Sequence, residues 1–251
     1  MKEQEGFLAR ISQLLSRGIG RQQLSMFYGQ GSADLRQEAW TRSVWKESQQ
    51  NAALLRTPLQ QLTYASIDIE TTGFHPAHGD EIISIAAVRM FGSTVSETEQ
   101  FFTYVRPTCN IPIHITELTG IREEDVVNAP ELAKAFCELE NFLNSSIIVG
   151  YYIGHELSFF NHFLWRAGRR RFDRRLLEMK KVAECLFPAN SVHTMEEMLI
   201  EAGIMVEGRH DALCDARMTA LLWGSFQSRL QEVKVETVEE LYEYMARSSG
   251  H

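Results

Sequence analysis

The chain has 251 residues, of which 44% are hydrophobic and 23% are charged, and its formal net charge is −8. These values are ordinary for a globular protein, and no apolar run reaches the roughly 18 residues that a membrane span requires. The acidic balance argues against a protein that coats nucleic acid non-specifically, because phosphate binding depends on Lys and Arg.

The N-terminal sequence Met-Lys-Glu-Gln-Glu-Gly carries acidic residues where a signal peptide would carry basic ones, and no continuous apolar segment follows. The cysteines lie far apart, with no pair at the spacing of a zinc site or a redox motif. We therefore expect a cytoplasmic protein with reduced thiols and no membrane contact.

Residues 1–60 have a different pattern from the rest of the chain. Apolar residues recur at helical spacing from Phe7 to Leu15, and Ser32 is a candidate cap for a second helix that carries Trp40 and Trp45. This pattern predicts a helical N-terminal extension, which either packs on the main domain or binds a partner.

From Tyr64 the pattern changes to that of strands. Strands are predicted over residues 64–70, 81–91 and 98–105, with a Gly-Ser turn between the last two. Three antiparallel strands fit this pattern.

The second half of the main domain is mostly helical. A helix is predicted over residues 130–143 and a short buried strand over 147–150. Strands followed by helices in alternation indicate an α/β fold with a sheet covered by helices on both faces. We expect one main domain over residues 61–232, then a C-terminal helix and tail over 233–251. Further helices are predicted near residues 157–167, 176–186, 194–202 and 211–230.

Asp68 and Glu70 are two residues apart on the first strand, so their side chains project from the same face. Two carboxylates at one place repel each other unless a cation lies between them, and hard divalent cations are the usual solution. The turn at Thr71, Thr72 and Gly73 strengthens this interpretation, because glycine lets the backbone come close to a ligand.

His210 and Asp215 lie at the entry to the last long predicted helix, where Asp211 is a candidate N-cap. An acid in a first helical turn is common by itself. A histidine beside metal-bound acids, however, can take a proton from water and direct the hydroxide at a phosphorus.

A basic cluster follows the helix predicted near residues 157–167. Its arginines either form a solvated helix end or guide a phosphate backbone. The aromatic residues Phe159, Phe163 and Trp165 follow helical spacing, and we expect them in the core. The arginines of the cluster are Arg166, Arg169, Arg170, Arg171, Arg174 and Arg175.

Three segments together resemble the motifs of the DEDD exonucleases. They are Ser-Ile-Asp68-Ile-Glu70-Thr-Thr-Gly, Val149-Gly-x3-Gly-His155-x3-Phe159-x3-Phe163-Leu164 and His210-x4-Asp215-Ala. The histidine of the last motif marks the DEDDh branch, which is similar to the proofreading epsilon subunit of the bacterial replicative polymerase. The resemblance runs from about residue 64 to residue 231, in order and at matching intervals.

This resemblance implies a ribonuclease H-like mixed sheet and removal of nucleotides from a 3′ end. Two Mg²⁺ or Mn²⁺ ions, roughly 4 Å apart in such sites, activate water and stabilise the leaving oxygen. Asp68 is expected to bridge both ions, Glu70 and Asp215 to complete the first, and His210 to act as general base. The residues expected to contact substrate are Thr71, Thr72, His155, Arg169, Arg170 and Arg171.

The middle motif departs from the family pattern, which reads His-Asn-x-x-Phe-Asp where this chain has Phe160 at the last position. The second ion then lacks its main protein ligand and is expected to bind weakly. Three explanations stand: Glu156 reaches the ion from one helical turn earlier; Asn161, His162 or substrate phosphates assist; or catalysis is lost and the fold serves as a binding module.

The favoured function is metal-dependent 3′–5′ exonuclease action on single-stranded DNA or frayed ends, releasing mononucleotides, attenuated by Phe160. The alternatives are a catalytically silent nucleic-acid-binding or polymerase-accessory module, and an exoribonuclease that trims RNA. The expected partners are 3′ ends of single-stranded DNA or RNA, and a polymerase or another replication or repair protein that binds residues 1–60.

Overall fold

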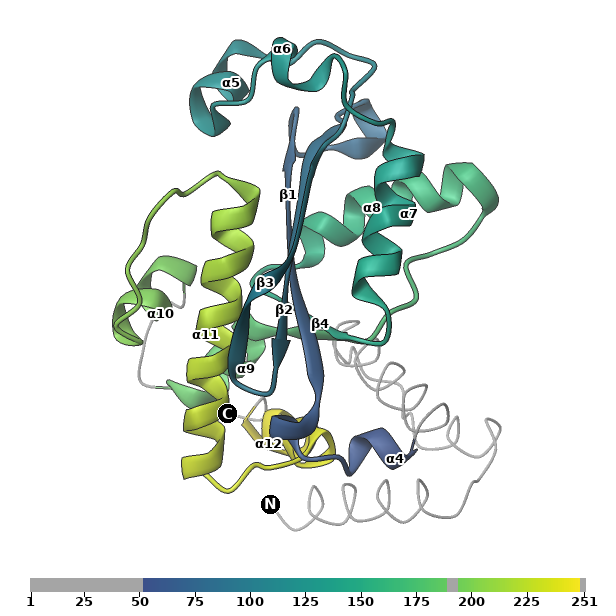
Figure 1. Cartoon of the computed structure of the whole chain (residues 1–251). Coiled ribbons are helices and arrows are strands. Elements are labelled where there is room, and N and C mark those ends of the chain that lie inside the picture. Colours follow the sequence, from purple (N-terminus) through teal and green to yellow (C-terminus); the bar gives the residue numbers. More distant parts are fainter. Residues whose placement is uncertain (1–51, 189–193, 249–251) are drawn as a thin grey trace, which may run out of the picture. The chain divides into compact units, whose positions relative to one another are not determined.

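The computed structural model describes residues 52–188 and 194–248, which divide into two units (Figure 1). One unit comprises residues 59–234. The other comprises, among the described residues, 52–58 and 235–248. It contains α4 (Ala52–Leu55) and α12 (Val238–Ser248), and a bridge pairs Pro58 with Thr237. The helices expected before residue 52 lie outside the described residues.

The larger unit is built on a five-stranded mixed sheet in the order β3-β2-β1-β4-β5. The first three strands are antiparallel, as predicted, and the last two are parallel. A mixed sheet of this kind confirms the expected α/β class. The strands are β1 (Thr63–Thr71), β2 (Ile82–Phe91), β3 (Thr94–Tyr104), β4 (Ile147–Gly150) and β5 (Leu176–Glu178).

Helices cover both faces of the sheet, with α7 and α8 on one side and α9, α10 and α11 on the other (Figure 1). None of the helices in the described parts of the chain is long and apolar enough to cross a membrane. The covering helices are α7 (Leu132–Leu143), α8 (Gly154–Gly168), α9 (Met179–Leu186), α10 (Met195–Glu201) and α11 (Ala212–Glu232).

Two parts of the prediction were wrong in detail. The helix expected over residues 176–186 begins only at Met179, because Leu177 pairs with Val149 and extends the sheet by a short strand. The short helices α5 (Ile113–Thr119) and α6 (Glu123–Val126) were not predicted. Their few apolar positions form a separate small cluster with Ile83.

The alternation of side chains along β1 decides what each face of the sheet carries. Ile67 and Ile69 belong to the core cluster that includes residues of α7 and α8. On the opposite face, the ring of Tyr64 lies 5.3 Å from that of Trp223 in α11. Asp68 and Glu70 continue the face of Tyr64, so they point toward α11.

Candidate active site

Asp68, Glu70 and Asp215 form an acidic cluster at the end of β1. One carboxylate oxygen from each lies within 4.8 Å of the others. Asp215 comes from the first turn of α11 and is buried, as is Glu70. The three acids expected from sequence to bind a metal therefore meet in the structure.

Two local contacts bring Asp215 to the strand. Ser66 donates a hydrogen bond from Oγ to the carbonyl oxygen of Ala216 at 2.7 Å, which joins β1 to the first turn of α11. Asp211 accepts a hydrogen bond from the backbone N–H of Cys214 at 2.9 Å, which confirms its predicted role as the N-cap. The start of the helix is thus fixed beside the strand acids.

Burial and mutual repulsion make Asp68 and Glu70 harder to ionise than isolated carboxyls. Burial, followed by the carboxylates of Glu156, Asp215 and Glu70, raises the pKa of Asp68 well above its ordinary value. Burial and then Asp215 and Asp211 raise the pKa of Glu70 to about 7. Oxygen donors that raise each other's pKa in this way fit a hard divalent cation.

Glu156 is a further acid whose charge acts on this group, although it does not belong to the set of oxygens within 4.8 Å of one another. It lies in the first turn of α8, it is 92% buried, and its Oε2 has no hydrogen-bond partner among the described residues. Burial, followed by the charges of Glu178 and Glu70, raises its pKa to about 8. Of the charges that act on Asp68, that of Glu156 raises its pKa most. A buried carboxylate with one oxygen free, acting on Asp68, fits the same cation.

Phe160 lies one helical turn further along α8 and belongs to the core. Its ring centroid is 5.4 Å from that of Phe136 and 5.4 Å from that of Phe172, and its side chain is fully buried. The ring occupies an apolar space. A carboxylate in the place of this ring would have only apolar neighbours. The side chain at position 160 is therefore part of the apolar core.

Glu178, at the end of β5, holds the start of α8 in place. Its two carboxylate oxygens accept hydrogen bonds from the backbone N–H groups of Tyr152 at 3.0 Å and Ile153 at 3.1 Å. It also accepts one from Lys180 at 3.0 Å and so caps α9. Sequence reasoning missed this residue because it placed Glu178 inside a helix.

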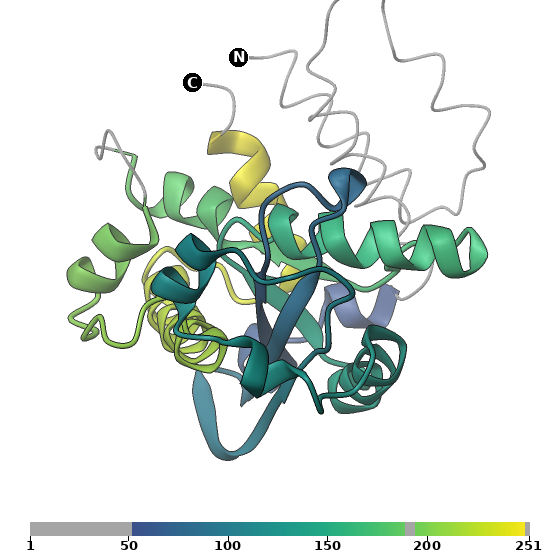
Figure 2. The same ribbon diagram turned by 90° about the horizontal axis from the view of Figure 1, so that it is seen from above.

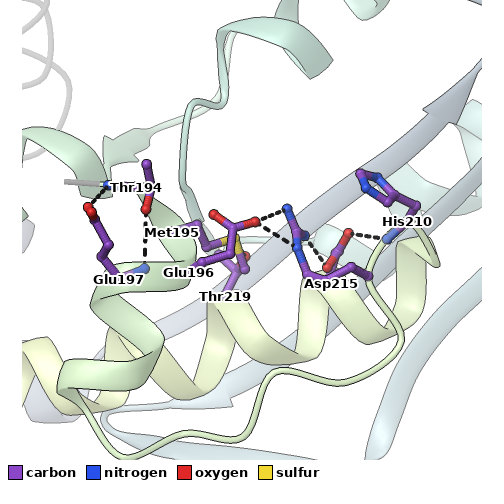
Figure 3. A network of polar contacts seen from close by, with 8 residues as sticks. Thr194, Met195, Glu196, Glu197, His210, Asp215 and Thr219 are labelled. Atoms are coloured by element: carbon purple, nitrogen blue, oxygen red, sulfur yellow. Dashed lines mark hydrogen bonds and ion pairs between the residues drawn. The ribbon is translucent and has the colours of Figure 1, made fainter. Parts of the chain in front are cut away.

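Arg209 is a second residue that sequence reasoning missed, because a single arginine in a loop gives no signal. It binds Asp215 through Nη1, and it donates to Glu196 of α10 at 3.0 Å through Nε (Figure 3). The backbone N–H of His210 donates to the other oxygen of Asp215 at 3.0 Å. Both oxygens of Asp215 are thereby oriented.

His210 itself adopts a left-handed backbone conformation with φ 65° and is exposed. Its imidazole lies clear of the Asp215 carboxylate (Figure 3). A ring in this place can reach water at the surface of the acidic cluster.

The loop after β1 uses its polar groups internally. Thr71 donates to the carbonyl oxygen of Gly73 at 2.6 Å, and the hydroxyl of Thr72 accepts from the backbone of Glu81 at 2.9 Å. A Cβ at position 73 would meet the carboxylate of Asp80, so a larger residue there would need the Asp80 side chain to move. The close approach that glycine permits is therefore to Asp80.

His155 lies between two aromatic rings, 5.7 Å from Phe74 and 5.0 Å from Phe159 between centroids. Burial lowers the pKa of His155, so the ring is neutral near pH 7. Phe74 is 71% exposed at the end of the loop. Sequence reasoning did not single out Phe74.

The arginines expected to contact substrate lie at the other end of α8. Arg169 is the C-cap of the helix, and Arg170 and Arg171 follow it. At 1.5 Å per residue, they are about 20 Å along the helix from Glu156. They do not belong to the acidic cluster.

This fold and this acidic cluster define an exonuclease domain with a ribonuclease H-like sheet. Residues 66–223 match the family model described as Exonuclease (RNase_T), and the chain belongs to this family. The expected class of enzyme, a 3′–5′ exonuclease that hydrolyses phosphodiester bonds, is confirmed by this match and its relatives.

The relatives include subunits of a DNA polymerase. The chain is 31% identical over 188 residues to the DNA polymerase III subunit epsilon of Aquifex aeolicus, covering 75% of this chain and 86% of that protein. It is 34% identical over 171 residues to a DNA polymerase III subunit epsilon-like protein of Rhodobacter capsulatus, covering 67% of this chain but 24% of that protein. The chain thus spans about a quarter of the longer relative.

Solved structures share the fold. The nuclease domain of 3′hExo, a DEDDh family member bound to rAMP, has a TM-score of 0.61 at 19% identity, covering 72% of this chain and 97% of that one. Exonuclease X in complex with 5′ overhanging duplex DNA has a TM-score of 0.55 at 18% identity, covering 72% and 99%.

Proposed function

We propose that this protein is a metal-dependent 3′–5′ exonuclease that releases mononucleotides from single-stranded or frayed DNA ends. The observation that carries this proposal is the meeting of Asp68, Glu70 and Asp215 within 4.8 Å, together with the unpartnered Oε2 of Glu156, whose charge acts on Asp68. Four acids on three separate elements have no structural reason to share a buried place unless they bind cations.

Asp68, Glu70, Asp215 and Glu156 would hold two Mg²⁺ or Mn²⁺ ions. When bound, such ions polarise the scissile phosphate and lower the pKa of a bound water. The protein holds the acids in position through the Ser66 hydrogen bond. Glu178 does the same for the helix that carries Glu156.

His210 is the proposed general base. It lies on the exposed loop that precedes α11, one residue after Arg209 and beside the acidic cluster. A neutral imidazole there can take a proton from the attacking water and return it to solvent, because its ring is exposed.

The loop at Thr71 and Thr72 is proposed to present its backbone to the terminal nucleotide, because both hydroxyls are already bonded within the loop. Phe74 and His155 would offer aromatic surface to a terminal base, since Phe74 is largely exposed and His155 is neutral.

The middle motif fits this proposal when it is moved four residues toward the N-terminus. Glu156 then stands at the position of the family's last acid, and Tyr151 and Tyr152 stand at its His-Asn positions. With all four carboxylates present, we expect ordinary rather than attenuated activity. A silent binding module is the alternative that this register disfavours.

DNA is proposed as the substrate because relatives of 30% identity or more include DNA polymerase III subunits. RNA is the second substrate to test, since structures of similar fold include one with histone mRNA stem-loop recognition. A polymerase or repair partner for residues 1–60, and a cytoplasmic location, remain part of the proposal.

The test is degradation of 5′-labelled single-stranded DNA and RNA with Mg²⁺, Mn²⁺ or a chelator. Metal-dependent shortening from the 3′ end, lost in Asp68→Asn and Asp215→Asn, is the expected result. Glu232→Gln, which changes an exposed acid on the same α11 helix, is the matched control. Metal-dependent binding without shortening would show a silent module, and faster loss of RNA would show an exoribonuclease.

A further inference from the structure

The C-terminal end of α8 carries an exposed aromatic residue among exposed arginines. Trp165 was expected in the core, but its side chain is 47% exposed. We call this surface the basic end of α8, and it consists of Trp165, Arg166, Arg169, Arg170 and Arg171.

This surface is held in one shape. Arg169 ends the helix with φ 56°, and its N–H donates to the carbonyl oxygen of Trp165 at 3.0 Å. Its guanidinium carbon lies 5.0 Å from the centroid of the Trp165 ring. Further on, the N–H of Phe172 donates to Oδ1 of Asn161 at 2.8 Å, and Phe172 is buried. The arginines are therefore presented on a fixed turn.

The charge of the surface is not neutralised by neighbouring acids. Arg174 binds Glu140 and the carbonyl oxygen of Asn144, so its charge is used to connect segments of the protein to one another. None of the ion pairs recorded for residues 52–188 and 194–248 includes Arg166, Arg170 or Arg171. In a chain of net charge −8, this leaves a local positive surface that suits a polyanion.

The position of this surface sets which part of a strand it can reach. It lies about 20 Å along α8 from Glu156, which is on the order of six stacked nucleotides at about 3.4 Å each. Figure 2 shows α8, in green, running outward from the sheet. A strand with its 3′ end at the acidic cluster and about six further nucleotides is therefore long enough to reach the basic end of α8.

We propose that the basic end of α8 is a second binding site for the nucleic-acid strand, which holds nucleotides several positions before the 3′ end. This inference rests on the proposed function and adds to it a substrate-length requirement. A base stacks on the open part of the Trp165 ring, and Arg170 and Arg171 bind phosphates. Aromatic stacking combined with arginine charge is the usual way to bind single strands without reading their sequence.

The test measures how tightly the wild-type protein and two variants bind short and long DNA strands. Binding of 5′-labelled DNA of about 3 and about 15 nucleotides is measured by fluorescence anisotropy in chelator, and cleavage of both is measured with Mn²⁺. Wild-type protein should bind the long strand at least tenfold more tightly. Arg170→Ala/Arg171→Ala should remove most of this gain and lower the salt slope by about 1.4. Trp165→Ala should weaken long-strand binding at least fivefold.

Matched controls separate this site from general charge effects. Arg122→Ala/Arg229→Ala removes the same charge at exposed positions elsewhere and should keep the gain with length. Trp165→Phe keeps a stacking surface and should restore part of the binding. All substitutions are at exposed side chains, so thermal melting should not change.

The outcomes distinguish the two proposals. Loss of the length gain with unchanged cleavage of the short strand supports both. A length gain and salt slope that persist in the variants overturn the second binding site alone. If no strand is cleaved at any metal concentration, but the variants still lose long-strand binding, the second site stands and the exonuclease proposal fails.

Discussion

Arg209 binds Asp215 from the side of α10, where Glu196 holds its guanidinium at 2.8 and 3.0 Å (Figure 3). The arginine therefore contacts an acid of the proposed metal site, although its guanidinium offers no oxygen and is not a metal ligand. Its positive charge also lowers the pKa of Asp68 and that of Glu70. It keeps the cluster partly charged in the absence of a metal.

Arg209→Gln should weaken metal binding. The pKa of Glu70 should rise further and Asp215 should lose one of its orienting partners, so Mn²⁺ affinity at neutral pH should fall roughly tenfold. Isothermal titration with Mn²⁺ measures this. The Mn²⁺ affinity of Arg209→Lys should lie between that of the wild type and that of Arg209→Gln. Arg217→Gln, which removes an exposed ion pair with Glu97, is the control. Tighter Mn²⁺ binding in Arg209→Gln would show instead that the guanidinium competes with the ion.

Glu156→Gln should lower both metal affinity and activity, because it removes a charged oxygen ligand with little change in shape. We expect at least a tenfold loss of Mn²⁺ affinity by titration, and a larger loss of cleavage. Glu184→Gln, at an exposed position of α9, should change neither. Wild-type affinity in the folded Glu156→Gln variant would remove Glu156 from the site.

Phe160→Asp should destabilise the protein and give no gain in activity. The substitution takes a buried ring from between Phe136 and Phe172 and leaves a carboxylate among apolar side chains, at a cost of about 3 kcal/mol or more. Denaturant unfolding measures the loss. Phe160→Asn is the comparison, because asparagine has nearly the shape of aspartate but no charge. Tighter Mn²⁺ binding by the Asp variant than by both the Asn variant and the wild type would show that residue 160 is at the metal site.

Stability without metal should fall as pH rises. The pKa values of Glu70 and Glu156 are raised to about 7 and about 8, so the folded protein keeps protons that the unfolded chain releases between about pH 5 and about pH 8. Each such proton contributes a slope of about 1.4 kcal/mol per pH unit. The other charged groups facing this pair are Asp68, Glu178, Arg209, Asp211 and Asp215.

Denaturant unfolding in chelator across this pH range tests the slope. Mn²⁺ binds the deprotonated acids, so adding it should reverse the trend. Glu156→Gln should flatten the slope by about one proton. Equal slopes for the two proteins would mean that Glu156 is ionised throughout.

The strand acids were predictable because their positions depend on a local rule. Alternation along β1 placed Asp68 and Glu70 on one face, and the Asp211 cap placed Asp215 in a first helical turn. Both signals depend only on residues that are close in sequence, and in the structure the strand acids and the N-cap lie where these signals predict.

The middle motif can be read in two registers for a physical reason. Aromatic rings recur every four residues along α8, at His155, Phe159 and Phe163. A shift by one helical turn therefore leaves the apolar pattern almost unchanged, and sequence alone gave no reason to prefer Glu156 over Phe160. Only the packing of Phe160 against α7 and the unpartnered oxygen of Glu156 separate the two registers.

Arg209 and Trp165 were not predictable in the same way. The role of Arg209 depends on α10 lying beside the first turn of α11, which no local pattern encodes. The helical spacing of Trp165 is that of a core residue, but the residue lies in the last turn of α8 and its side chain is exposed.

The hydrogen bond from Ser66 to Ala216 has a consequence for when the enzyme can first act. The two residues it joins are about 150 positions apart, and such distant contacts form late in folding. A growing chain on the ribosome carries Asp68, Glu70 and Glu156 but lacks Asp215 until the first turn of α11 has been synthesised. We therefore expect a chain cut before α11 to leave no active fragment, because it lacks both Asp215 and the contact that places it beside the strand acids.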